Sequence, residues 1–134
     1  MIRQVIHETR LFSRWASKEG LGSSSLCLAV KEMAAGLFEA DLGGGLLKKR
    51  IARAGQGKSG GFRTLVATNR GDRWMFVFGF SKNERSNVDK DELGALKKLA
   101  EQLLGLAPTA MNTALAAGEL VKVNCDEKDE VNNP

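Results

Sequence analysis

The sequence predicts an α+β fold built from helices and antiparallel strands. Two segments, 62–69 and 73–80, are rich in β-branched and aromatic residues, and Arg70-Gly71-Asp72 joins them as the turn of a hairpin. Residues 90–105 carry leucines and an alanine spaced three to four apart, the pattern of an amphipathic helix that packs against a sheet. Two further helical patterns precede the hairpin.

The other elements follow from local patterns in chain order. A short strand is expected over 2–6, a helix over 9–18 that Gly20 and Gly22 end, and a second helix over 23–36. After a glycine turn at 43–45, a strand over 46–53 leads into the loop AGQGKSGG. A short helix over 109–117 and a strand over 119–123 complete one domain over 1–124. Residues 125–134 are predicted to form a disordered polar tail.

Length and composition exclude several classes of protein. The chain has 134 residues, which fits one domain, and it lacks the apolar run of roughly 20 residues that a membrane helix needs. Its N-terminus has no apolar core of a secretory signal. Cys27 and Cys125 are too few and too distant in sequence to indicate a disulfide framework or a cysteine zinc site, and His7 is the one histidine. We therefore expect a cytoplasmic protein with reduced cysteines, no cofactor and no structural metal.

Positive charge is concentrated in the middle third of the chain. Residues 44–87 carry ten lysines and arginines against two acids, whereas the segments on either side are neutral or acidic. From Gly43 to Asn69 there is no acid at all. Such a segment is often ordinary solvated surface, but its length favours a polyanionic partner, with nucleic acid as the first candidate.

One motif of this segment and several residues outside it have simpler explanations than a nucleotide or catalytic site. Residues 55–60 match the dinucleotide fingerprint G-x-G-x-x-G, but a strand follows where the fingerprint requires a helix. The interpretation that remains is a flexible loop whose glycines allow close approach to a phosphate backbone, with Lys58 supplying charge. His7 is a candidate general base, although a lone histidine near a terminus is more often a surface or strand-edge residue. Asp89, Asp91 and Glu92 are expected to cap the long helix.

The basic residues of the strands form the more informative constellation. Because side chains alternate along a strand, Lys48 and Arg50 should share one face and Lys49 the other. Arg63 opens the next strand, and Lys82 and Arg85 follow the third. Three neighbouring antiparallel strands can gather these residues into one concave patch. The patch would bind phosphates non-specifically or stabilise a pentacovalent phosphate transition state.

The stretch from Asp41 to Ala100 resembles the RelE/HigB-like toxins of type II toxin–antitoxin modules. The similarity extends over about 2–123 and is closest to the branch with a KSGG(F/Y)R signature, here GKSGGFR, followed by a strand and then F-x-K-N-E-R. It implies a RelE-like α+β fold in which N-terminal helices and a C-terminal helix pack on a small twisted antiparallel sheet.

The resemblance also implies an activity and partners. Members typically act as mRNA interferases, metal-independent endoribonucleases that inhibit translation by cutting mRNA in the ribosomal A site. The 2′-hydroxyl attacks the scissile phosphate. The implied partners are the ribosome, mRNA and a cognate antitoxin encoded by the adjacent gene, with no membrane partner.

Site residues are carried over position by position. The resemblance implies a catalytic set and an RNA-binding set. The catalytic set comprises Arg63, Lys82, Lys48 and Arg50; the RNA-binding set comprises Lys49, Arg53, Lys58, Arg85 and Asn83. Asn83 stands where the RelE prototype has an arginine, and Asp89 where it has a tyrosine. Arg73, at the far end of the hairpin, is expected to lie outside the site.

The chain has no tyrosine, so a base or stacking group must come from another residue type. A lysine among neighbouring cations is one candidate for the acid or base. The alternative function is a non-catalytic inhibitor of the same fold, such as a ParE-like poison of DNA gyrase.

Overall fold

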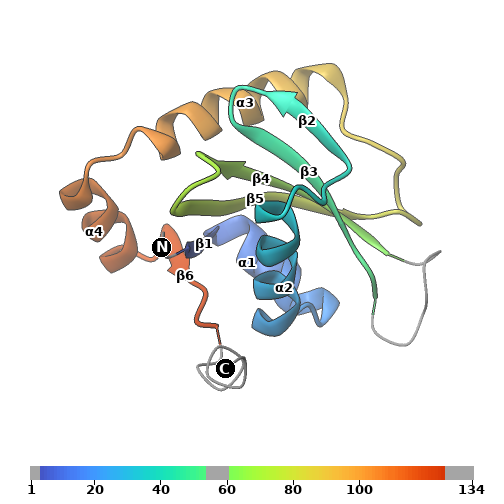
Figure 1. Ribbon diagram of the computed structural model, residues 1–134, viewed down its shortest axis with the longest axis horizontal. Coiled ribbons are helices and arrows are strands. Elements are labelled where there is room, and N and C mark those ends of the chain that lie inside the picture. Colours follow the sequence, from blue (N-terminus) through green and yellow to red (C-terminus); the bar gives the residue numbers. More distant parts are fainter. Residues whose placement is uncertain (1–3, 54–60, 126–134) are drawn as a thin grey trace.

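A twisted sheet with helices on both faces makes up the part of the chain that the computed structural model describes, residues 4–53 and 61–125 (Figure 1). The elements in chain order are β1 (Val5–Thr9), α1 (Arg10–Glu19), α2 (Ser23–Ala34), β2 (Ala40–Gly43), β3 (Leu46–Ile51), β4 (Phe62–Thr68), β5 (Arg73–Ser81), α3 (Lys90–Leu104), α4 (Pro108–Ala116) and β6 (Leu120–Lys122). The predicted α+β class is confirmed, with each expected helix within a residue or two of its predicted bounds.

The strand order within these residues is β2-β3-β4-β5-β1-β6. The β3-β4-β5 meander is antiparallel, as predicted, and its register sets Arg50 opposite Arg63 and Arg63 opposite Phe80. Two features were not predicted. β1 pairs parallel with β5, and a four-residue strand, β2, adds to the edge of β3. β2 has the sequence ADLG, which carries no β signal, and it forms because β3 offers it a free edge.

The first apolar layer lies between the sheet and helices α1 and α2. Trp74 and Phe76 of β5 pack there against Phe12 of α1 and Val30 of α2, all of them buried. Gly79 allows α1 to approach β5, since a Cβ atom at this position would lie 2.2 Å from the Trp15 ring. This face is therefore closed by close helix–sheet packing.

The second apolar layer lies between the opposite face of the sheet and α3, which runs along it in Figure 1. Leu65 and Met75 are covered by Leu96 and Ala100 of α3. The predicted capping role of the acids is confirmed: Asp89 and Glu92 form a reciprocal capping box at the start of α3. At its end, Arg73 Nη1 donates to the carbonyl oxygens of Leu103, Leu104 and Leu106.

The two cysteines are joined by a disulfide, so the expectation that they are reduced is wrong. Cys27 in α2 and Cys125 after β6 have their Cα atoms 5.8 Å apart, although 98 positions separate them in sequence. The Val123 backbone N–H donates to the Ile6 carbonyl oxygen, which holds the chain after β6 beside β1. Both cysteines pack there against the first apolar layer. A contact made by tertiary folding alone leaves no spacing signal in the sequence.

Three predictions fall wholly or partly outside the described residues: the start of the first strand, the loop that contains Lys58, and the polar tail beyond Cys125. Among the described helices, none is both long and apolar enough to cross a membrane.

Candidate nucleic-acid interface

The predicted basic patch begins where the apolar residues under α3 end. Along β3, Lys48 and Arg50 continue the face that starts with Leu46, and along β4 Arg63 continues the face of Leu65. Arg50 and Arg63 are directly opposite each other, and Phe80 of β5 completes the row. The alternation expected from the sequence is confirmed, since Lys48 and Arg50 lie on one face and Lys49 on the other.

Arg63 is the most enclosed cation of this row, with 8% of its surface exposed. Its Nε lies 3.0 Å from Glu39 Oε1, so the two side chains form an ion pair. Its Nη1 is buried and makes no hydrogen bond within the described part of the chain. A buried donor without a partner costs about 1–3 kcal/mol and is uncommon in folded proteins. One donor of the Arg63 guanidinium is therefore enclosed and unpaired, as is Nε of Arg53 on the other face of the sheet.

Arg50 is half-buried beside Arg63, and Gly61 lies next to it. A Cβ atom on Gly61 would lie 3.0 Å from the carbonyl oxygen of Ile51, which is a tight contact, and 3.5 Å from Arg50 Nε, which is an ordinary one. The close approach of the Ile51 backbone therefore favours glycine at the last glycine of the GKSGGFR motif. This is a structural reason for that glycine directly before Phe62 and Arg63.

The segment after β5 reaches the same end of the sheet. The Lys82 backbone N–H donates to the Gly61 carbonyl oxygen at 3.3 Å, which sets Lys82 beside the glycine that precedes β4. Lys82 and Asn83 are both exposed. Lys48 Nζ donates to Asn87 Oδ1 at 3.3 Å, so β3 is linked to the same segment. Four predicted residues, Lys48, Arg50, Arg63 and Lys82, therefore belong to one region.

Arg85 is fully engaged within this region. Its guanidinium forms a bidentate ion pair with Glu92 and lies over the rings of Phe78 and Phe80. The hydrogen bond to Glu92 raises the pKa of Arg85, and the same contact is the main cause that lowers the pKa of Glu92. Arg85 thus joins the segment after β5 to the start of α3 and covers the aromatic end of the row.

Two predicted RNA-binding residues lie on the wrong face for this role. Lys49 is 8% exposed and pairs with Glu32 of α2 at 2.9 Å, while it also donates to the Leu37 carbonyl. Arg53 pairs with Glu19 of α1 at 3.2 Å and stacks over Phe62. Both hold helices to the sheet. Lys58, the third, lies outside the described residues.

His7 is also remote from the patch. It lies on β1, opposite Met75 and Lys122, and is 3% exposed. Burial lowers its pKa, and the nearby charges of Lys122 and Arg73 lower it further. The alternative that it acts as the base of a site on β3 and β4 is therefore not supported. Within the described residues, no group of three or more histidine, cysteine or acidic side chains is placed to hold a metal ion.

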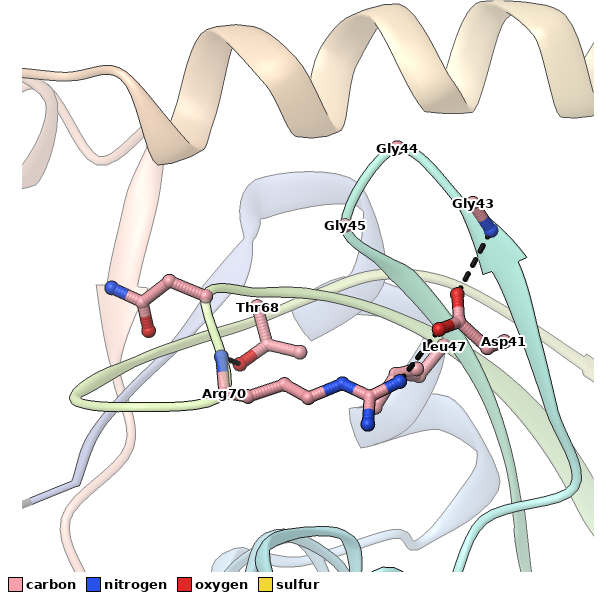
Figure 2. Close-up of a pocket in the computed structure, with 8 residues that line it drawn as sticks. Asp41, Gly43, Gly44, Gly45, Leu47, Thr68 and Arg70 are labelled. Atoms are coloured by element: carbon pink, nitrogen blue, oxygen red, sulfur yellow. Dashed lines mark hydrogen bonds and ion pairs between the residues drawn. The ribbon is translucent and has the colours of Figure 1, made fainter.

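The opposite end of the same strands holds a polar pocket of about 430 Å³ (Figure 2). Figure 2 shows the Arg70 guanidinium directed at Asp41, 2.6 Å away, while the other oxygen of Asp41 accepts from the Gly43 backbone N–H. Arg70 has φ of +61°, unusual for a residue other than glycine, and its N–H is held by Thr68 Oγ1. Arg70 is therefore neutralised locally, far from Arg63 along β4.

Sequence reasoning missed the two acids that matter most, Glu39 and Asp41. Glu39 directly precedes the unpredicted strand β2 and Asp41 lies within it; Glu39 pairs with Arg63 and Asp41 with Arg70. The available signal was their position immediately before that segment. A count of charges along the chain separates acids and bases that the sheet brings together.

Comparison with known proteins agrees with the fold. The model of one family, described as the RelE toxin of the RelE/RelB toxin–antitoxin system, matches residues 4–123. No curated protein matches the sequence.

Proposed function

Because the chain belongs to the RelE toxin family and thus has an antitoxin as its partner, we propose that it inhibits translation as a ribosome-dependent endoribonuclease. In the proposed reaction the 2′-hydroxyl of one nucleotide attacks the adjacent phosphate. The bond to the 5′-oxygen of the next nucleotide breaks, leaving a cyclic phosphate and a free 5′-hydroxyl. This chemistry needs charge stabilisation and proton transfer. The site of action is the cytoplasm, where ribosomes and mRNA meet.

The observation that carries the proposal is the pair Arg50 and Arg63, opposite each other on β3 and β4, with a guanidinium donor of Arg63 left unsatisfied. Negative charge builds on the phosphate oxygens as the pentacovalent state forms, and preorganised donors aimed at that charge are the largest single source of rate acceleration in many enzymes. A guanidinium offers a planar fork that fits two such oxygens.

The remaining residues of the region have distinct proposed roles. Lys48 and Lys82 add positive charge at the reacting phosphate, and one of them is the candidate for proton transfer. Asn83 contributes RNA contacts next to Lys82. Arg85 acts through its ion pair with Glu92, which secures the segment that carries Lys82 and Asn83. Lys49 and Arg53 are omitted from the RNA contact set because they are paired on the opposite face.

A second candidate is the non-catalytic inhibitor, such as a ParE-like gyrase poison. Two observations favour it: the chain contains no tyrosine, and Arg63 is largely enclosed by its pairing with Glu39. Under this alternative Arg63 serves to hold β4 and the segment before β2 together.

Induced expression followed by primer extension on cellular transcripts separates the two. The nuclease gives cuts at defined codon positions within minutes of induction, and the Arg63→Ala protein, produced at equal level, gives none. DNA damage without transcript cuts identifies the gyrase poison. Copurification with the product of the adjacent gene tests the antitoxin: a stable complex is expected, and unhindered growth on overexpression without any bound partner contradicts the toxin assignment.

A further inference from the structure

We propose that Glu39 is a positioning residue for Arg63: its carboxylate holds the guanidinium by Nε and leaves the Nη edge for the scissile phosphate. This inference rests on the proposed nuclease function and assigns a role to a residue that no sequence motif singles out. It starts from the geometry of the ion pair, in which Glu39 Oε1 lies 3.0 Å from Arg63 Nε.

The backbone at Glu39 is anchored to the sheet. Glu39 directly precedes β2, and its own N–H donates to the Lys48 carbonyl oxygen at 2.8 Å, so the main chain here is anchored to β3. Arg63 is anchored in turn by the β4 ladder. An arginine side chain has four rotatable bonds. An ion pair at Nε between two anchored residues restricts rotation about these bonds before substrate arrives.

The contact of Glu39 with Nε determines which guanidinium donors of Arg63 stay unpaired. A guanidinium presents two bidentate edges, one of which includes Nε and the other the two Nη atoms. Glu39 contacts the first edge, and Nη1 on the second has no partner among the described residues. Nη1 is itself enclosed by the protein, and the contact at Nε leaves it unpaired. Glu39 therefore fixes the direction of the guanidinium from the side of Nε.

Glu39 also lowers the repulsion between Arg50 and Arg63. Residues directly opposite on neighbouring strands have Cβ atoms about 5 Å apart, and like charges there destabilise the sheet. Glu39 supplies one negative charge at Arg63, the more buried of these two cations. Glu92, the acid at the neighbouring segment, pairs with Arg85 and belongs to the α3 capping box.

The test is single-turnover cleavage on programmed ribosomes by the full-length protein, read as a maximal rate and a half-saturating ribosome concentration. Glu39→Ala is expected to lower the maximal rate by about 10–100-fold, the scale of a misplaced catalytic group. Its half-saturating concentration should stay equal or fall, because removing an acid strengthens attraction to RNA. Glu39→Gln keeps the oxygen acceptor for Nε and should restore most of the rate.

A double variant separates positioning from direct participation. In the Arg63→Ala background, Glu39→Ala should cause no further loss of rate, because residues that act as a unit are non-additive. A further loss there means that Glu39 acts on the substrate itself, as a proton acceptor would, and overturns the proposal. A rate above wild type for Glu39→Ala overturns it in favour of masking.

Glu32→Ala is the matched control, since Glu32 pairs with Lys49 at 2.9 Å on the other face and should leave the maximal rate unchanged. Thermal melts accompany every variant, and a rate loss in Glu39→Gln as large as in Glu39→Ala contradicts orientation by the Nε contact. If the wild type cleaves and Glu39→Ala is fully active, the positioning role of Glu39 is overturned while the proposed nuclease function stands. Failure of the wild type to cleave overturns the proposed function, and the positioning role with it.

Discussion

The two faces of the sheet use their cations in different ways. On the α1–α2 face, Lys49 and Arg53 each pair with a carboxylate of a helix and meet a further partner, a carbonyl oxygen or an aromatic ring. On the α3 face, Arg50 and Arg63 lie side by side, and Arg63 pairs with Glu39, which no helix carries. Each face has an arginine with one buried donor that lacks a partner in the described residues, Nε of Arg53 and Nη1 of Arg63. Lys49 and Arg50 are neighbours in sequence, yet one fastens a helix and the other faces the candidate site. Position on the pleat, not charge, assigns the role.

The largest effect that tests this contrast concerns the disulfide on the α1–α2 face. Removing a cross-link between residues 98 apart frees the unfolded chain, and the loop-closure model gives a loss of about 4.7 kcal/mol in the free energy of unfolding. We expect Cys27→Ser to lower the free energy of unfolding from urea titrations by that amount and to shift the urea midpoint down accordingly, while cleavage per folded molecule stays unchanged. The wild-type protein melted with and without reductant is the companion measurement. Equal midpoints would show that the cross-link contributes nothing to stability.

Arg63→Ala should have the next largest effect, on catalysis. Loss of one preorganised donor at a developing oxyanion slows reactions by about 10²–10³-fold. Arg63→Lys should recover only part of the rate, because an ammonium cannot present the same fork. Ribosome binding should change far less, since Lys48, Arg50 and Lys82 remain. A variant that cuts at the wild-type rate removes Arg63 from the site, and one that is inactive only because it is unfolded supports a purely structural role.

Arg73→Ala sharpens the comparison at the other end of the same hairpin. Its guanidinium donates to three carbonyl oxygens at the end of α3, where a cation also complements the helix dipole. We expect a loss of about 2 kcal/mol in stability, the scale of hydrogen bonds to a charged group. The cleavage rate of the folded fraction should equal that of wild type. A selective loss of cleavage would extend the site along the whole of β5.

The smallest expected effect distinguishes Lys48 from Lys49. If Lys48 contacts a phosphate, Lys48→Ala should reduce the slope of log affinity against log salt by about one. Lys49→Ala should leave that slope unchanged and lower the melting temperature instead, because it breaks the ion pair with Glu32 and frees the Leu37 carbonyl. Ribosome binding across a salt series decides between them. Equal slopes for both variants would mean that the two faces do not differ in RNA contact.

Much of the fold was predictable because its signals are local. The hairpin of β4 and β5, the α3 stripe and the capping box at Asp89 each depend on residues close together in sequence, so periodicity and capping chemistry reveal them. Strand alternation likewise places Lys48 and Arg50 on one face and Lys49 on the other from the sequence alone. The position of the basic segment and the resemblance to the RelE family can also be recognised from the sequence alone.

Only the tertiary structure decided which cations remain available. The pairings of Arg63 with Glu39, Arg70 with Asp41 and Arg53 with Glu19 join residues 24 to 34 positions apart, and no local pattern encodes them. The same holds for the Cys27–Cys125 disulfide and for the parallel pairing of β1 with β5. Charge pairing depends on distances in space, and the sheet sets these by bringing strands and helices from distant parts of the chain side by side. The sequence alone determined where the positive charge lies along the chain, and folding determined which of these charges pair within the protein.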